Sequence, residues 1–152
     1  MYLREAKAHE LDTIYAIGFD VWNDGLSYEE YLTDCRSSEK YQAGTWYVLV
    51  ENEQILSSLI VYQGLFDLKE GCFGIGSVAT PNNIRYKGYA SHLLNLMKTE
   101  LFINHNGKAI FLHCDIDPQF YSRLGFTSIE GSDCMYISSD TFVFNGSIPA
   151  YF

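Results

Sequence analysis

Basic residues are scarce in this sequence of 152 residues. Lysine and arginine together number 10 against 19 aspartates and glutamates, which gives a formal net charge of −9. A field of that sign repels polyanions, so we expect neither nucleic acid nor a membrane as a partner. The same field favours a cationic partner such as a basic amine, although in many proteins a high net charge serves only solubility.

Other absences narrow the class of protein further. The four cysteines are far apart, with no Cys-x-x-Cys pair, so we expect reduced thiols, no metal and a cytoplasmic location. The N-terminal residues include charges and no apolar run, and no stretch is long and apolar enough to cross a membrane. Neither a repeat nor a linker nor a low-complexity tract divides the chain, so we expect a single domain over residues 1–152.

The residues that are abundant indicate a folded protein with many aromatic rings. Hydrophobic residues make up 47% of the chain and charged residues 19%, which is typical of a globular domain. Aromatic residues reach 16%, including 12 tyrosines and 10 phenylalanines. So many rings can fill a core, build stacking surfaces or form the face of a homodimer, and core packing is the commonest use.

The first third of the sequence predicts two helices. Apolar residues recur at helical spacing over residues 11–22 and predict one amphipathic helix, which ends at Asn23-Asp24-Gly25. Ser27 and Glu30 then form a capping box, which predicts the start of a second helix.

Further along the chain, strands alternate with two more helices. Tyr89 begins a strongly amphipathic helix that Asn106-Gly107 ends, and Asp117 caps a short helix. Strands are predicted at residues 2–4, 45–50, 55–62, 72–80, 109–114, 126–129 and 135–137. Gly74 and Gly76 interrupt one of these strands and mark a bulge or a close approach. The order β-α-α-β-β-β-α-β-α-β-β predicts an α+β, or mixed α/β, domain around one sheet.

The strand over residues 72–80 leads into a loop that is basic within an acidic chain. Arg85 and Lys87 supply positive charge, and Gly88 lets the backbone approach a ligand closely. The helix that follows offers unpaired N–H groups and a partial positive charge, an arrangement that binds phosphate. The loop has neither the Gly-Lys-Ser/Thr of a Walker loop nor the G-x-G-x-x-G of a Rossmann loop. Taken alone, Arg-x-x-Gly-x-Ala also fits an ordinary loop before a helix.

In context, this loop resembles the coenzyme A signature of the GCN5-related N-acetyltransferase (GNAT) family. That signature reads Arg/Gln-x-x-Gly-x-Gly/Ala, and Arg85, Gly88 and Ala90 match it. The strand before the loop ends in Val78, Thr80 and Pro81, again as in the family.

A second motif, residues 120–126, resembles the family's closing Tyr-x-x-x-Gly-Phe element through Tyr121, Gly125 and Phe126. The resemblance covers nearly the whole chain. It implies a GNAT-like fold with a central, mostly antiparallel sheet of six or seven strands flanked by about four helices.

The family likeness also implies acetyl coenzyme A as co-substrate and assigns residues to it. The backbone of the strand end should pair with the pantetheine arm, and the amides of residues 86–91 should cradle the pyrophosphate. The implied cofactor-binding residues are Val78, Thr80, Arg85, Tyr86, Lys87, Gly88, Tyr89, Ala90 and Ser91.

The resemblance gives Tyr121 the role of general acid that protonates the leaving thiolate, because a phenol is protonated at neutral pH. Without the motif, Tyr121 would be interpreted as a packed aromatic residue. Asp115 is the preferred base for the amine. Asp117, Glu51 and His113 are alternatives, with Asp117 better explained as a helix cap and His113 as a core or edge histidine.

Two departures from the family pattern affect these assignments. The chain has Cys114-Asp115-Ile116-Asp117-Pro118-Gln119 where many members carry Asn-x-x-Ala, and the strand over residues 72–80 has no carboxylate. Cys114 as a covalent acyl carrier is the weaker alternative to direct transfer, since no evident base activates it.

The sequence thus predicts an N-acetyltransferase that acts by direct attack of a primary amine, either a small cationic amine or a lysine or peptide amine. A non-catalytic acyl-coenzyme-A sensor and a partner-binding module remain as alternatives. The acceptor pocket is expected to come from the variable segments, residues 23–41 and the chain after Gly131.

Overall fold

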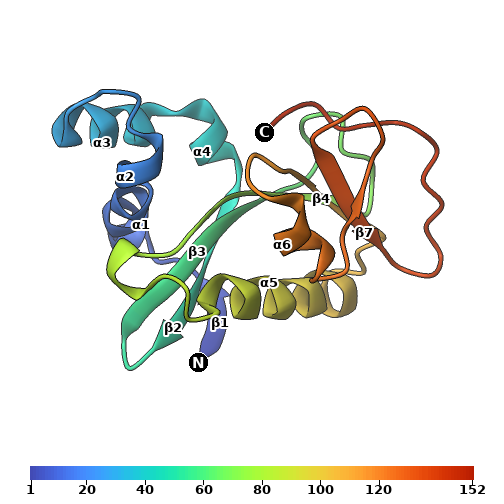
Figure 1. Ribbon diagram of the computed structural model, residues 1–152, viewed down its shortest axis with the longest axis horizontal. Helices are drawn as coiled ribbons and strands as arrows, with labels where there is room; N and C mark the ends of the chain where they lie inside the picture. The colour runs from blue at the N-terminus through green and yellow to red at the C-terminus, as the bar shows by residue number, and fades with distance from the viewer. The chain divides into compact units, whose positions relative to one another are not determined.

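The computed structural model describes all 152 residues and contains one mixed sheet of seven strands, in the order β1-β2-β3-β4-β5-β7-β6 (Figure 1). The strands are β1 (Tyr2–Glu5), β2 (Thr45–Glu51), β3 (Gln54–Tyr62), β4 (Cys72–Ala79), β5 (Ala109–His113), β6 (Thr127–Ser128) and β7 (Cys134–Ser138). Every predicted strand is present within a few residues of its predicted bounds. The predicted α+β class and the single sheet are confirmed.

Six α-helices and three shorter helical turns accompany the strands. The helices are α1 (Leu11–Ile17), α2 (Phe19–Trp22), α3 (Tyr28–Ser37), α4 (Glu39–Ala43), α5 (Tyr89–Thr99) and α6 (Pro118–Ser122). The turns are η1 (Ala8–Glu10), η2 (Asn82–Ile84) and the π-helical η3 (Glu100–Asn104), which continues α5. Helix α4 was not predicted. None of these helices combines the length and the apolar character needed to cross a bilayer.

Of the strand pairs described here, only β4 and β5 are parallel, and the others are antiparallel. β1 pairs with β2 from Tyr2↔Val50 onward, and β7 pairs in the antiparallel sense with both β5 and β6. β4 and β5 are parallel, and their register ends at Ile75↔Leu112. The last residues of β4, from Gly76 on, therefore extend past the pairing with β5.

The chain divides into two compact units, residues 1–60 with 77–93 and residues 61–76 with 94–152. In the first unit, helices α1 to α4 gather beside the β2–β3 hairpin (Figure 1). The hairpin turns through Asn52 and Glu53, both at positive φ, at the predicted position. In this unit the core consists of side chains from the helices and strands, among them Ile14, Leu32, Val48, Leu56 and Leu59.

The single helix predicted over residues 11–22 is wrong, because the chain breaks at Gly18 into α1 and α2. A Cβ built on Gly18 would lie 2.3 Å from the Trp22 ring and 3.1 Å from the Tyr31 hydroxyl. The Trp22 indole thus covers Gly18 and leaves no room for a side chain at that position. Periodicity could not reveal this break, since the apolar spacing is the same in one helix or two.

Two capping interactions agree with the sequence. Ser27 accepts a hydrogen bond from the Glu30 amide, and Glu30 accepts one from the Ser27 amide, so the capping box at the start of α3 is confirmed. Asp117 accepts from the Gln119 amide at the start of α6, which confirms its role as a helix cap.

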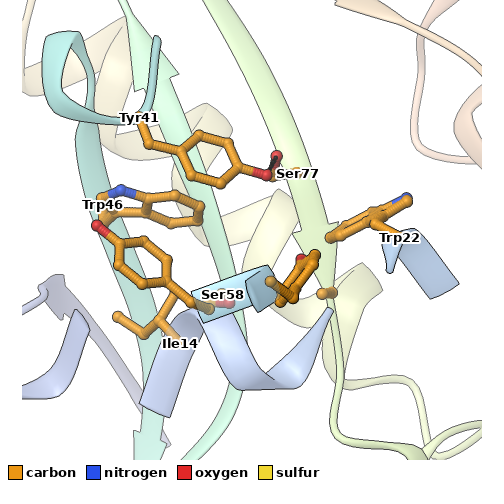
Figure 2. Close-up of a pocket in the computed structure, with 9 residues that line it drawn as sticks. Ile14, Trp22, Tyr41, Trp46, Ser58 and Ser77 are labelled. Carbon is orange, nitrogen blue, oxygen red and sulfur yellow. Dashed lines mark hydrogen bonds between the residues drawn. The ribbon is translucent and has the colours of Figure 1, made fainter. Parts of the chain in front are cut away.

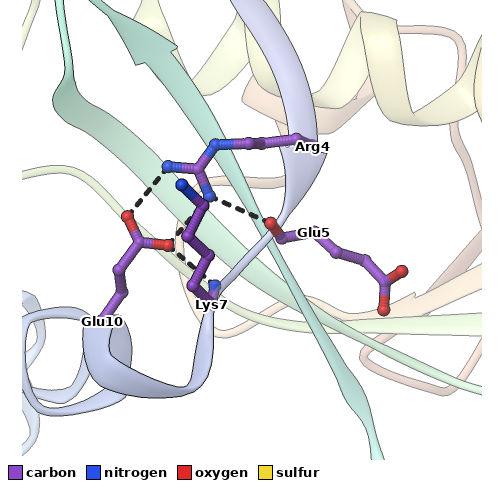
Figure 3. A network of polar contacts seen from close by, with 4 residues as sticks. All are labelled: Arg4, Glu5, Lys7 and Glu10. Carbon is purple, nitrogen blue, oxygen red and sulfur yellow. Dashed lines mark hydrogen bonds and ion pairs between the residues drawn. The ribbon is translucent and has the colours of Figure 1, made fainter.

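A compact ion pair joins the start of the chain to η1 (Figure 3). Both terminal nitrogens of Arg4 donate to the Glu10 carboxylate at 2.8 Å. The same carboxylate accepts a hydrogen bond from the Lys7 amide at 2.7 Å. These bonds hold the pKa of Glu10 at about 2, well below its ordinary value, with Arg4 as the main cause.

In the second unit, an aromatic cluster explains Gly74. The ring of Phe152 fills the space in which a Cβ would lie, with its Cζ 2.6 Å from that position. Phe152 also contacts Tyr62, Phe66 and His113 at ring-centroid distances of 4.8–5.7 Å. A glycine in this strand was expected to mark a bulge or the approach of another backbone or a ligand, whereas the group that approaches Gly74 is a side chain.

All four cysteines are buried and none forms a disulfide. The predicted absence of a disulfide framework agrees with this arrangement.

Candidate active site

The end of β4 contains a residue with an unusual backbone conformation and is held by hydrogen bonds from β3. Ser77 has φ of 48° inside the strand, a conformation that costs a non-glycine residue about 1–2 kcal/mol and that often occurs at functional sites. Ser57 of β3 donates to the Ala79 carbonyl at 2.9 Å and lies 3.0 Å from the Thr80 hydroxyl. The end of β4 is thus held from the β3 side by a buried serine.

The loop between β4 and α5 is exposed and rich in positive φ. Tyr86 has φ of 65° with a fully exposed side chain, and Gly88 has φ of 84°. A Cβ on Gly88 would meet no heavy atom within 4 Å, so open space faces the backbone there. The exposed Lys87 lies beside it, directly before the N-terminus of an eleven-residue helix. These features fit a pyrophosphate, which needs accessible amides, a positive field and room.

Arg85 is not a free cation. Its two terminal nitrogens donate to the carboxylate of Asp20 in α2 at 2.8 and 2.9 Å, and its Nε donates to the Thr80 carbonyl at 2.9 Å. The Asp20 carboxylate raises the pKa of Arg85, and Arg85 lowers that of Asp20. The predicted cofactor arginine therefore braces the loop against α2.

A small pocket opens beside the same strand end (Figure 2). Its lining comes from all four N-terminal helices and from β2, β3 and β4. The lining residues are Ile14, Tyr15, Trp22, Tyr31, Tyr41, Trp46, Ser58, Ser77 and Ala79. Five of the nine are aromatic, and none is charged. The pocket has room for about one water-sized group.

Three of the rings in this lining contact one another. Tyr15 and Tyr41 are nearly parallel, with centroids 5.8 Å apart, and Trp46 meets both edge-on at 5.8 and 5.1 Å. The Ser77 hydroxyl donates to the Tyr41 hydroxyl at 3.2 Å, as Figure 2 shows. Ser77, the residue of β4 with positive φ, is thereby linked to α4.

The Ser58 hydroxyl is buried in this pocket without a hydrogen-bond partner. Ser58 is only 1% exposed. A buried hydroxyl without a partner costs about 1–3 kcal/mol. Such a group is retained at that cost more readily where a ligand or a water completes its bonding.

The second unit groups Tyr121 of α6 with Cys114 and Asp115. Tyr121 is buried and packs edge-on against Phe120 and Phe126. Burial, helped by the charges of Cys114 and Asp115, raises the pKa of its phenol. Tyr121 therefore keeps its proton over the whole physiological range and is able to donate a hydrogen bond, while giving up the proton less readily than a free phenol.

Cys114 has the properties of an inert thiol. It donates to the Ile116 carbonyl, with 3.1 Å between sulfur and oxygen, and burial raises its pKa. A nucleophilic cysteine needs the opposite shift. The structure thus argues against Cys114 as an acyl carrier.

The other proposed bases occupy different surroundings. Asp115 is exposed in the segment between β5 and α6. The His113 ring lies 3.1 Å from the Ala150 carbonyl and contacts the rings of Tyr151 and Phe152, and burial lowers its pKa. This agrees with the interpretation of His113 as a packed edge histidine. Glu51 ends β2 at the hairpin turn.

The sequence matches the family model described as the Acetyltransferase (GNAT) family over residues 8–126, most of the chain. The chain belongs to the GNAT acetyltransferase family. A search of curated protein sequences finds no match.

Solved GNAT structures share the fold at low sequence identity. A GNAT family acetyltransferase from Brucella melitensis in complex with acetyl-CoA is 15% identical, with 99% of this chain and 92% of that one covered and a TM-score of 0.66. Tetrahymena GCN5 is 13% identical over 94% and 99% of the two chains, with a TM-score of 0.67. A chimera of the spermidine N-acetyltransferase SpeG from Vibrio cholerae and hSSAT is 16% identical over 91% and 96%, with a TM-score of 0.65.

In this GNAT chain, the cofactor residues predicted from the motif lie on the end of β4, the loop and the start of α5. Sequence reasoning missed Asp20, Ser57 and Ser58, because each reaches the site only through the packing of distant segments. Tyr41, which lines the aromatic pocket, lies at the end of the variable segment 23–41. That segment was expected to build the acceptor pocket, and this expectation was the sequence signal for Tyr41.

Proposed function

We propose that the chain is an acetyl-CoA-dependent N-acetyltransferase that transfers an acetyl group to a primary amine by direct attack. The observation that carries this proposal is the end of β4. The strand runs past its register with β5 and leads through an open, glycine-containing loop into α5. A strand edge and a helix N-terminus in series suit a ligand with an amide-rich arm and a pyrophosphate.

In this proposal the cofactor is bound mainly through the backbone. Val78 and Thr80 pair with the pantetheine arm, and the amides from Tyr86 to Ser91 bind the pyrophosphate, with Lys87 as the nearest free charge. The remaining residues of the predicted set, Arg85, Gly88, Tyr89 and Ala90, shape and hold the loop. A backbone N–H near Val78 polarises the thioester carbonyl.

The chemical step needs two proton transfers. The amine nitrogen forms a bond to the acetyl carbon as the carbon–sulfur bond breaks, and the amine loses a proton to Asp115, directly or through water. Tyr121 donates a hydrogen bond and then its proton to the departing sulfur. Because burial raises the pKa of Tyr121, stabilisation of the thiolate by the hydrogen bond is the larger part of its effect.

An acceptor screen tests the proposal. The protein is incubated with acetyl-CoA and a panel of small cationic amines, lysine and peptides with free amines, and the acetylated products are identified by mass spectrometry. We expect acetylation of at least one primary amine. Saturable binding of coenzyme A with no turnover on any acceptor would contradict the enzyme and favour an acyl-coenzyme-A sensor. An intact fold with no affinity for coenzyme A would favour a partner-binding module.

A further inference from the structure

The aromatic pocket next to β4 has several features that suit a ligand. Aromatic residues and serines make up seven of its nine lining residues, and Ser58 contributes a buried hydroxyl without a partner. Trp22 and Tyr41 are partly exposed, and the pocket is partly open to solvent. Ser77 and Ala79, on either side of Val78, belong to the strand end to which we assign the thioester.

Aromatic faces and hydroxyl oxygens together bind an ammonium group. The negative face of a ring attracts a cation, most strongly for tryptophan and tyrosine, and hydroxyl oxygens accept hydrogen bonds from N–H. The free space suits one group of the size of –NH3⁺. The net charge of −9 also draws cations toward the protein.

The same lining cannot take a proton from that ammonium group. No carboxylate or imidazole lines the pocket, and burial raises the pKa values of Tyr15 and Tyr31, which keeps both phenols protonated. The carboxylates that act on these phenols, Asp12 and Asp20, are held in ion pairs by Arg36 and Arg85. An ammonium group bound here therefore meets no base among the lining residues, and a charged amine is not a nucleophile.

We propose that this pocket binds a second ammonium group of the acceptor, distinct from the amine that is acetylated, so that the acceptor is a diamine or a longer polyamine. This inference rests on the proposed N-acetyltransferase function. The bound ammonium fixes one end of the acceptor while the other, neutral amine reaches the acetyl group.

Fluorescence offers a direct test of the pocket, because both tryptophans of the chain, Trp22 and Trp46, line it. Diaminobutane is titrated into the protein without acetyl-CoA while tryptophan emission is recorded, with butanediol as the uncharged probe of equal length. We expect a saturable change with the diamine and none with the diol. Equal responses to both probes, or no response to the diamine, would overturn the proposal.

Two variants make this test specific. Tyr41→Leu removes one ring of the lining and should weaken diaminobutane binding at least about tenfold. Tyr2→Leu removes the same ring from an exposed position in β1 and should leave the affinity unchanged. Ser58→Ala should weaken binding severalfold without loss of stability, since its hydroxyl has no partner in the protein. Unchanged affinity in folded Tyr41→Leu and Ser58→Ala would contradict the assignment.

Kinetics separate this inference from the proposed function. Acetylation of diaminobutane should exceed that of butylamine by at least about tenfold in kcat/KM. Equal rates for both amines would refute the ammonium pocket and leave the acetyltransferase intact. Saturable diamine binding with no acetylation of any amine would refute the acetyltransferase and leave the cation pocket intact.

Discussion

Arg85 and Asp20 form a two-pronged ion pair across 65 residues of sequence, with nitrogen–oxygen distances of 2.8 and 2.9 Å. The pair joins the loop before α5 to helix α2. Because Arg85 also binds the Thr80 carbonyl, one side chain fixes the position of the loop relative to the strand end and to the wall of the aromatic pocket. Because Asp20 pairs with the guanidinium charge, our proposal assigns phosphate binding to Lys87 and to the backbone.

We expect Asp20→Asn to tighten coenzyme A binding severalfold, because it frees the Arg85 charge next to the loop. It should also destabilise the fold slightly, by about 0.5–1 kcal/mol, since the pair is partly exposed. Calorimetric titration at low and high salt measures the first effect. The matched control is Asp12→Asn, which removes a similar two-pronged pair with Arg36. Weaker coenzyme A binding in Asp20→Asn would mean that the positioning of the loop by the Arg85–Asp20 pair contributes more to affinity than the freed charge of Arg85.

Gly88→Asp should weaken coenzyme A binding by at least about tenfold, or roughly 1.4 kcal/mol. The change places a negative side chain where the pyrophosphate is expected. Gly88→Ala carries the same strain at φ of 84° without the charge, so the difference between the two variants isolates the electrostatic part. Gly131→Asp, at φ of 77° with open space around its Cβ, controls for charge and strain elsewhere. Unchanged affinity in a folded Gly88→Asp protein would exclude this loop as the phosphate site.

Tyr121→Phe should lower the rate of the chemical step by roughly 10²-fold, because it removes the hydroxyl that we propose as the donor to the departing sulfur. Single-turnover measurements report this step even when product release limits kcat. Coenzyme A affinity and stability should barely change, and Tyr136→Phe serves as the control in the same unit. A wild-type single-turnover rate in the Phe variant would leave Tyr121 with a packing role only.

The raised pKa of Tyr121 has a consequence for the pH profile. Burial favours the neutral phenol, so the hydroxyl remains protonated beyond its ordinary titration near pH 10. We therefore expect no loss of single-turnover rate from this group between pH 7 and about 10. A decline with a midpoint well below 10 that disappears in Tyr121→Phe would contradict the burial argument.

Glu10→Gln should destabilise the protein by about 1–2 kcal/mol at neutral pH, less than the full pKa shift implies because solvent screens the pair. The carboxylate has a pKa of about 2 in the fold and an ordinary value of 4.5. Its contribution is fully present above pH 4.5 and is lost as the pH falls toward 2. The difference in unfolding free energy between wild type and Glu10→Gln should shrink across that window. Glu5→Gln, an exposed neighbour, is the control, and a difference independent of pH would refute the ion-pair explanation.

Local interactions were the part of the fold that the sequence predicted well. The capping box of Ser27 and Glu30 and the cap at Asp117 depend on residues within three positions of each other. The hairpin turn at Asn52 and the positive φ of Asn106, just after η3 ends the helix that α5 began, likewise follow from local backbone preferences. These signals, with hydrophobic periodicity, were sufficient for the element order.

Contacts between distant segments were the part that could not be predicted. The break at Gly18 depends on the Trp22 ring and on Tyr31, and the Asp20–Arg85 pair depends on the relative placement of α2 and the loop. The lining of the aromatic pocket could not be predicted either, since no sequence pattern distinguishes Trp46 and Ser58 from other strand residues. The family motifs indicated where a cofactor should bind but gave no information on what surrounds it.

The four unpaired cysteines have a practical consequence for the study of this protein. Burial raises the pKa of all four thiols, that of Cys134 to about 11, so the folded chain presents little thiolate at neutral pH. A chromogenic disulfide reagent should consequently react slowly with the native protein and rapidly with free coenzyme A, which allows turnover to be followed continuously by colour. Denaturation would expose the same four groups at once, so one reagent can report both the catalytic output and the fraction of protein that is still folded.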